Sequence, residues 1–124
     1  MQDGKYVVLC IDDDADIREC LQIILEENDY IPVLAESAEE GYRVYEETKP
    51  DLIIVDMMME IADAGTDFTK KVREHNKNIP IYMLSSVGAG LSMNIDYNEI
   101  GLTGILQKPI DNDLLLSLLT ASLK

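Results

Sequence analysis

The chain has 124 residues, a length that predicts one domain over residues 1–124, with a single core and no room for a separate output domain. Its hydrophobic and charged contents, 47% and 27%, are ordinary for a soluble protein, and no apolar run approaches the ~20 residues of a membrane span. The formal net charge of −14 disfavours direct binding to nucleic acid or to an anionic membrane, because their phosphates would be repelled.

The N-terminus and the two cysteines bear on the cellular compartment in which we expect the protein. Residues 1–5 lack the basic region, apolar core and cleavage site of a signal peptide, so we expect a cytoplasmic protein. Cys10 falls in the first predicted strand and Cys20 on the apolar side of the first predicted helix, without metal-type spacing. We expect both to be small core residues, since a structural disulfide is disfavoured in a reducing compartment.

Along the chain, strand patterns alternate with helix patterns. The strand patterns cover residues 5–11, 30–35, 52–56, 79–84 and 103–107. The first two helix patterns begin at predicted caps: one runs from Asp14 to Asn28-Asp29, and the other from the capping box at Ser37 to Thr48. Further helix patterns cover residues 67–76 and 88–100. The last follows Asp111, and its segment Leu114–Leu119 has more leucines than a core needs. Residues 60–66 predict a loop, and 88–100, with two glycines and weak periodicity, fits a frayed helix or a loop; we favour the helix.

This alternation predicts an α/β fold. Connections of a dozen or more residues that contain one helix imply parallel strands with right-handed crossovers, and hence a three-layer α/β/α sandwich. Pro32 lacks a backbone donor, which favours a sheet edge for the second strand. We therefore expect a doubly wound, flavodoxin-like sheet of five strands in the order 2-1-3-4-5, with strands one and three adjacent at the topological switch point.

Polar residues follow the strands at their C-terminal ends. They are Asp12, Asp13, Asp56, Ser85 and Lys108. All of these ends lie along one edge of a parallel sheet, so the three carboxylates converge and would repel one another without a cation, for which their hard oxygens suit Mg²⁺. On its own stretch of sequence, Asp56 also fits a residue that caps a helix or a turn.

Together these side chains provide the functional groups that phosphoryl transfer needs. The Asp56 carboxylate can act as a nucleophile and form an acyl phosphate, while a metal ion and the Lys108 ammonium neutralise charge on the transferring oxygens. The Ser85 hydroxyl would donate a hydrogen bond to one of those oxygens.

With these residues, the chain resembles a known family, the CheY-like response-regulator receiver domains, over essentially its full length. The motifs that carry the resemblance are Ile11-Asp-Asp-Asp14, Asp56-Met-Met-Met59, Pro80-Ile-Tyr-Met-Leu-Ser85 and Gln107-Lys-Pro109. Each motif alone is weak, but the set is specific.

The resemblance implies a function in two-component signalling. Asp56 would accept a phosphoryl group from a histidine kinase or phosphotransfer protein, with Mg²⁺ required, and phosphorylation would change binding to a downstream effector protein. A homodimer that is weak or depends on phosphorylation is also compatible with this function. Asp13, Asp56 and the backbone carbonyl of Met58 would bind the metal directly, and Asp12 largely through water. Such a protein assists its own phosphorylation and dephosphorylation but is not a turnover enzyme. A cis peptide between Lys108 and Pro109 is also implied.

Two departures from the family pattern bear on the mechanism. Glu60 stands where the family commonly has proline, and the loop to Gly65 is about one residue longer, which affects the position of the Met58 carbonyl. Ile105 stands where many receivers have an aromatic residue that turns inward on activation. We expect Ser85 and its loop to shift toward the phosphoryl group without an aromatic switch.

Two other functions fit parts of the pattern. A Mg²⁺-dependent phosphatase could use Asp56 as its nucleophile, but such enzymes usually have a second aspartate two residues later, where this chain has Met58. An unphosphorylated interaction module is disfavoured because residues competent for the chemistry fill all five site positions. The sequence therefore favours the phosphoacceptor.

Overall fold

The computed structural model describes residues 4–56, 64–85, 101–108 and 110–123. The strands in these residues are β1 (Val7–Ile11), β2 (Ile31–Ala35), β3 (Leu52–Asp56), β4 (Ile81–Ser85) and β5 (Gly104–Gln107). The helices are α1 (Ala15–Glu27), α2 (Ala38–Thr48), α3 (Ala64–Arg73) and α5 (Asn112–Leu123). The helix predicted over 88–100 lies outside the described residues.

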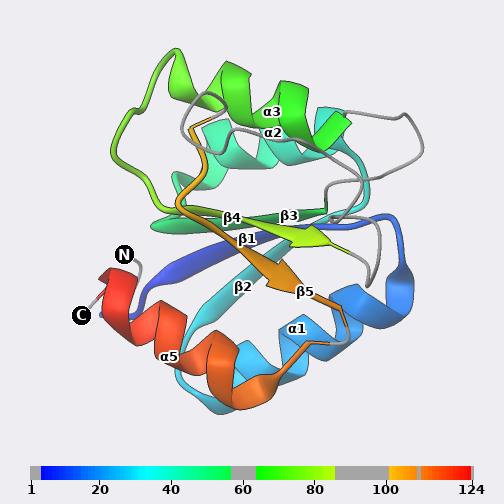
Figure 1. Ribbon diagram of the computed structural model, residues 1–124, viewed down its shortest axis with the longest axis vertical. Helices are drawn as coiled ribbons and strands as arrows, with labels where there is room; N and C mark the ends of the chain where they lie inside the picture. Colours follow the sequence, from blue (N-terminus) through cyan, green and yellow to red (C-terminus); the bar gives the residue numbers. More distant parts are fainter. Residues whose placement is uncertain (1–3, 57–63, 86–100, 109, 124) are drawn as a thin grey trace.

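The five strands form one parallel sheet in the order β2-β1-β3-β4-β5, which confirms the predicted topology. Helices α1 and α5 cover one face of the sheet, and α2 and α3 cover the other (Figure 1). The predicted three-layer, doubly wound architecture is therefore confirmed. Among the described residues, no helix is both long and apolar enough to cross a membrane.

The core has two halves because the sheet is covered on both faces. Along β1, Val8 and Cys10 pack in the half that α1 and α5 close, whereas Leu9 and Ile11 pack in the half that contains Phe68 of α3. This alternation follows from the pleat, which directs successive side chains to opposite faces. Every residue of β1, β3 and β4 is buried, as expected for central parallel strands.

Side-chain caps set the starts of α1 and α2. Asp14 Oδ1 accepts a hydrogen bond from the Asp16 N–H at 2.9 Å, so the predicted N-cap is confirmed. Ser37 Oγ accepts from the Glu40 N–H at 3.1 Å. The returning half of the capping box falls one residue early, because Glu40 Oε1 accepts from the N–H of Glu36, at 3.3 Å.

Two local predictions are wrong. Helix α3 begins at Ala64 and ends at Arg73, about three residues before the predicted limits on each side. Gly65 thus lies in a first helical turn, where backbone N–H groups have no intrahelical partner and the penalty for glycine is smaller. Cys20 is exposed, because the buried face of α1 is formed by Leu21, Ile24 and Leu25 and leaves Cys20 at its margin.

Candidate functional site

Three aspartates meet at the C-terminal ends of two neighbouring strands, β1 and the central β3. Asp12 and Asp13 follow β1, and Asp56 is the last residue of β3. Ile11 and Val55 are register partners in the β1–β3 pair, so Asp12 and Asp56 are the next residues along two neighbouring strands. One carboxylate oxygen from each aspartate lies within 4.8 Å of the others. The predicted convergence of the three side chains is confirmed.

The three carboxylates differ in their surroundings. Asp12 is 0% exposed and Asp56 4% exposed, whereas Asp13 is open to solvent. A buried carboxylate needs polar partners to offset its lost hydration. Asp12 Oδ1 accepts from the Asp14 N–H at 2.9 Å, and the Asp12 N–H donates to the Ala35 carbonyl at 3.1 Å. Asp12 is thereby held between the ends of β1 and β2.

Lys108, just after β5, supplies a positive charge to this cluster. Its Nζ lies 3.0 Å from Asp12 Oδ2 and 3.5 Å from Asp56 Oδ1. No other described residue donates a hydrogen bond to Asp12 Oδ2. Burial lowers the pKa of Lys108, but the hydrogen bond and charge of Asp12, followed by those of Asp56, outweigh it and raise the pKa above its ordinary value. Lys108 is therefore an ammonium at neutral pH.

Ser85 lies at the end of β4, between β3, which ends at Asp56, and β5, which Lys108 follows. It is 3% exposed, and its register partner in β5 is Gln107. Asp56 pairs with Leu84, so Ser85 is one residue further along the adjacent strand. The Lys108 N–H donates to the Ser85 carbonyl at 2.8 Å, which extends the β4–β5 ladder by one step. The sheet thus brings the predicted hydroxyl and ammonium residues to the edge where the aspartates meet.

The donor set suits a divalent cation. Three carboxylates against one ammonium give a formal charge of −2, and Asp13 leaves one side of the cluster open to water. Hard oxygen ligands with room for water molecules are what Mg²⁺ prefers. Met58, the predicted source of a carbonyl ligand, and Pro109, the predicted cis residue, lie outside the described residues, so both remain predictions.

One contact of the site was not predicted from the sequence. Arg18, placed on the polar side of α1, donates from Nη1 to the Asp12 carbonyl at 2.7 Å. Nothing in the sequence pattern distinguishes an arginine on the solvated face of a helix from one that folds back onto the preceding loop.

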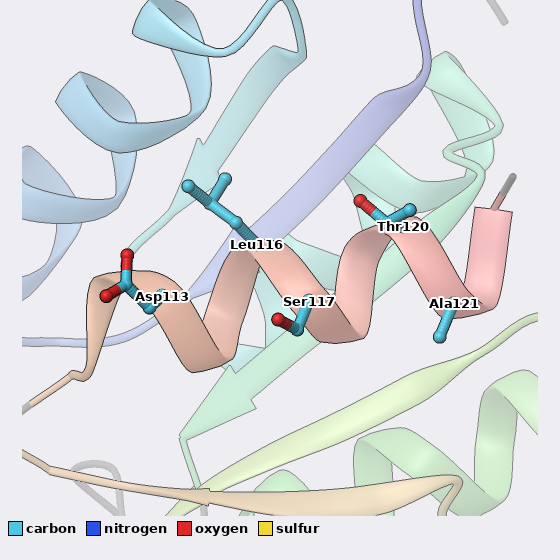
Figure 2. Close-up of a pocket in the computed structure, with 5 residues that line it drawn as sticks. All are labelled: Asp113, Leu116, Ser117, Thr120 and Ala121. Carbon is cyan, nitrogen blue, oxygen red and sulfur yellow. The ribbon is translucent and has the colours of Figure 1, made fainter.

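A separate depression lies on α5, away from the strand ends. Its lining residues are Asp113, Leu116, Ser117, Thr120 and Ala121, all from this one helix (Figure 2). Nearby, Leu114 is 49% exposed, in line with the surplus leucines of the sequence, whereas Leu115 and Leu119 are buried. The depression contributes no group to the acidic cluster.

The match to known proteins agrees with this geometry. A family model described as the response regulator receiver domain matches residues 8–120. The chain belongs to this family, the CheY-like receivers of two-component signalling. Receivers of this family are typically phosphoacceptors rather than turnover enzymes, and the acidic triad is compatible with the metal site typical of them.

Individual relatives agree with the family and differ in length. The chain is 34% identical over 102 residues to the chemotaxis protein CheY of Halobacterium salinarum, covering 82% of this chain and 83% of that protein. It is 32% identical over 123 residues to the phosphate regulon transcriptional regulatory protein PhoB of Pseudomonas aeruginosa, covering 98% of this chain but 52% of that relative.

A solved structure gives the same fold. The chemotaxis protein CheY4 of Vibrio cholerae superposes with a TM-score of 0.87 at 29% identity, over 97% of this chain and 100% of that one.

Proposed function

We propose that this chain is a phosphoacceptor receiver in which Asp56 takes a phosphoryl group from a histidine kinase or a phosphotransfer protein. The observation that carries the proposal is the position of Asp56. Its buried carboxylate ends a central strand, 3.5 Å from the Lys108 ammonium and in one cluster with the oxygens of Asp12 and Asp13.

Asp56 is a better acceptor than its two neighbours. Asp12 follows β1 instead of lying in it, and its Oδ1 accepts a hydrogen bond from the Asp14 N–H of the same loop. Asp13 is exposed in the loop after β1, where water would compete for an acyl phosphate. Asp56 is the one of the three that belongs to a strand, paired in register with β4, and a nucleophile gains from such rigid placement.

The transfer is a displacement at phosphorus. An oxygen of Asp56 forms the new bond to phosphorus, and the bond to the donor nitrogen or oxygen breaks with its electron pair leaving on the donor. Lys108 neutralises charge that develops on the phosphoryl oxygens, and Ser85 donates its hydroxyl to one of them. Asp13, Asp56 and the Met58 carbonyl would hold Mg²⁺ directly and Asp12 largely through water, and the ion would supply further neutralisation of the phosphoryl oxygens.

Phosphorylation then changes the surface that a downstream effector protein binds. The phosphoryl group adds negative charge beside Ser85 and Lys108, and moving either residue toward it shifts the end of β4 or β5. Ile105, in β5 at the place of the usual aromatic, is partly buried against the half of the core that contains Phe68. The shift of Ser85 rather than an aromatic rotation carries the signal.

The test is incubation with Mg²⁺ and acetyl phosphate, followed by intact-mass spectrometry. We expect the wild type to gain one phosphoryl group, and we expect no gain for Asp56→Asn or for wild type in EDTA. Labelling of Asp56→Asn at the wild-type level would refute Asp56 as the acceptor. Steady turnover of a generic phosphomonoester, abolished in Asp56→Asn, would instead support a phosphatase.

A further inference from the structure

Arg18 of α1 connects to the acidic cluster through the backbone rather than through a carboxylate. Its Nη1 donates to the Asp12 carbonyl oxygen at 2.7 Å. Its Nη2 lies 3.9 Å from Glu36 Oε2, but the Glu36 side chain is 66% exposed, against 20% for Arg18. An exposed pair at that distance contributes little, so the contact with the Asp12 carbonyl is the stronger one.

The bonded carbonyl controls the direction of Asp13. The Asp12 carbonyl and the Asp13 N–H belong to one planar peptide unit, which turns as a rigid body. The Asp12 N–H, on the other side, is held by the Ala35 carbonyl at 3.1 Å. With both ends of Asp12 fixed, the orientation of the Asp12–Asp13 peptide is fixed. The next peptide is held as well, because the Asp14 N–H donates to Asp12 Oδ1 at 2.9 Å. With the peptides on both sides of Asp13 held, the direction in which its side chain leaves the backbone is restricted.

Asp13 is the carboxylate that depends most on this support. Asp12 is held by Asp14 and Lys108, and Asp56 is held by its strand and Lys108. The Asp13 carboxylate, by contrast, is the exposed member of the cluster. Its place in the cluster therefore depends on the backbone that carries it.

From these contacts we infer that Arg18 is a positioning residue for Asp13: by holding the Asp12–Asp13 peptide, it keeps the Asp13 carboxylate directed at the metal site. This inference rests on the proposed function, in which Mg²⁺ binds at the acidic cluster.

Removing Arg18 has two opposite effects on Mg²⁺ affinity, and the direction of the net change tests the inference. Loss of a positive charge near the carboxylates would tighten Mg²⁺ binding through Coulomb attraction. Loss of the hydrogen bond would let the peptide turn and weaken binding, and loss of such outer contacts typically costs 10–100-fold in metal affinity. The positioning role predicts that weakening prevails, with a dissociation constant about 10-fold higher in Arg18→Met.

The measurement is the Mg²⁺ dissociation constant by isothermal titration calorimetry, with thermal unfolding in EDTA as a check on folding. The matched control is Arg43→Met, which removes the same charge from an exposed arginine paired with Glu47 at 3.8 Å on α2. We expect wild-type affinity for Arg43→Met and an intermediate affinity for Arg18→Lys, which keeps the charge and one donor.

Affinity in Arg18→Met equal to or tighter than wild type would overturn the inference, as would equal weakening in Arg43→Met. If Arg18→Met does not fold in EDTA, Arg18→Lys carries the test, and wild-type affinity in that variant would overturn it. Absence of Mg²⁺ binding to the wild type would overturn the proposed metal site and this inference with it.

Discussion

Lys108 Nζ lies 3.0 Å from Asp12 Oδ2, closer than its 3.5 Å separation from Asp56 Oδ1. Lys108 follows β5 and Asp12 follows β1, and β3 and β4 lie between these strands in the sheet. The lysine side chain therefore reaches across two strand ends. Without a bound cation, this ion pair is the main neutralisation that the described residues offer to the buried Asp12.

The Lys108 ion pairs predict a dependence of stability on alkaline pH. The pKa of Lys108 is raised on folding, so its stabilisation is fully present below the ordinary pKa of lysine and is lost as pH rises through the higher folded value. The difference in free energy of unfolding between wild type and Lys108→Met should therefore shrink between about pH 9 and about pH 12. Urea unfolding measures it, with the exposed Lys77→Met as control; a constant or growing difference would contradict the ion pairs.

Mg²⁺ should stabilise the wild type and not Asp13→Asn. At ten times the dissociation constant, a ligand that binds only the folded state adds about 1.4 kcal/mol. In EDTA we expect Asp13→Asn to be at least as stable as wild type, because one of three mutually repelling carboxylates is gone. Thermal unfolding followed by circular dichroism gives both quantities. Asp16→Asn, the same charge change at an exposed neighbour, should keep the response to Mg²⁺; equal Mg²⁺ stabilisation of Asp13→Asn would count against the site.

The two cysteines should differ sharply in reactivity. Cys10 is 0% exposed, and burial, with a contribution from the charge of Asp12, raises the pKa of its thiol, whereas Cys20 is exposed. A disulfide reagent such as DTNB should label one thiol quickly in the native protein and both in guanidinium chloride. In Cys20→Ser, native labelling should be at least ~1000-fold slower, because Cys10 reacts only through unfolding. Two fast thiols in the native wild type would show that β1 is more accessible than the fold implies.

A hydrogen bond should couple β4 to α5. Tyr82 Oη and Ser122 Oγ are 2.6 Å apart. A double-mutant cycle of Tyr82→Phe and Ser122→Ala should give a coupling energy of about 1 kcal/mol in the free energy of unfolding. Ser117→Ala, on the exposed side of α5, should show no coupling to Tyr82→Phe. Strictly additive effects of the first pair would mean that the bond contributes nothing to stability.

The topology and the acidic cluster could be predicted because both depend on short-range patterns. Alternating strand and helix segments determine a parallel sheet, and a residue that follows a strand must lie at the sheet edge, which is how Asp12, Asp13 and Asp56 could be placed together. The pattern failed where its signals are weak. Gly65 is typical of a loop yet lies in the first turn of α3, and Cys20 has helical spacing yet lies at the margin of the buried face.

The contacts that orient the site could not be predicted. Side-chain rotamers decide whether Lys108 lies nearer Asp12 or Asp56. Rotamers and the direction of one peptide plane decide whether Arg18 contacts the Asp12 carbonyl or points to solvent. No periodicity in the sequence encodes either. These contacts are also the ones that distinguish three aspartates of similar sequence context.

The most direct test of the account asks which carboxylate becomes phosphorylated. After incubation with Mg²⁺ and acetyl phosphate, borohydride reduces an acyl phosphate to an alcohol, which converts the modified aspartate to homoserine, and peptide mass spectrometry locates it. We predict homoserine at position 56, present only when both Mg²⁺ and the phosphodonor were added. Homoserine at Asp12 or Asp13, or none at any position while a known receiver is labelled in parallel, would contradict the assignment of Asp56 as the phosphoacceptor.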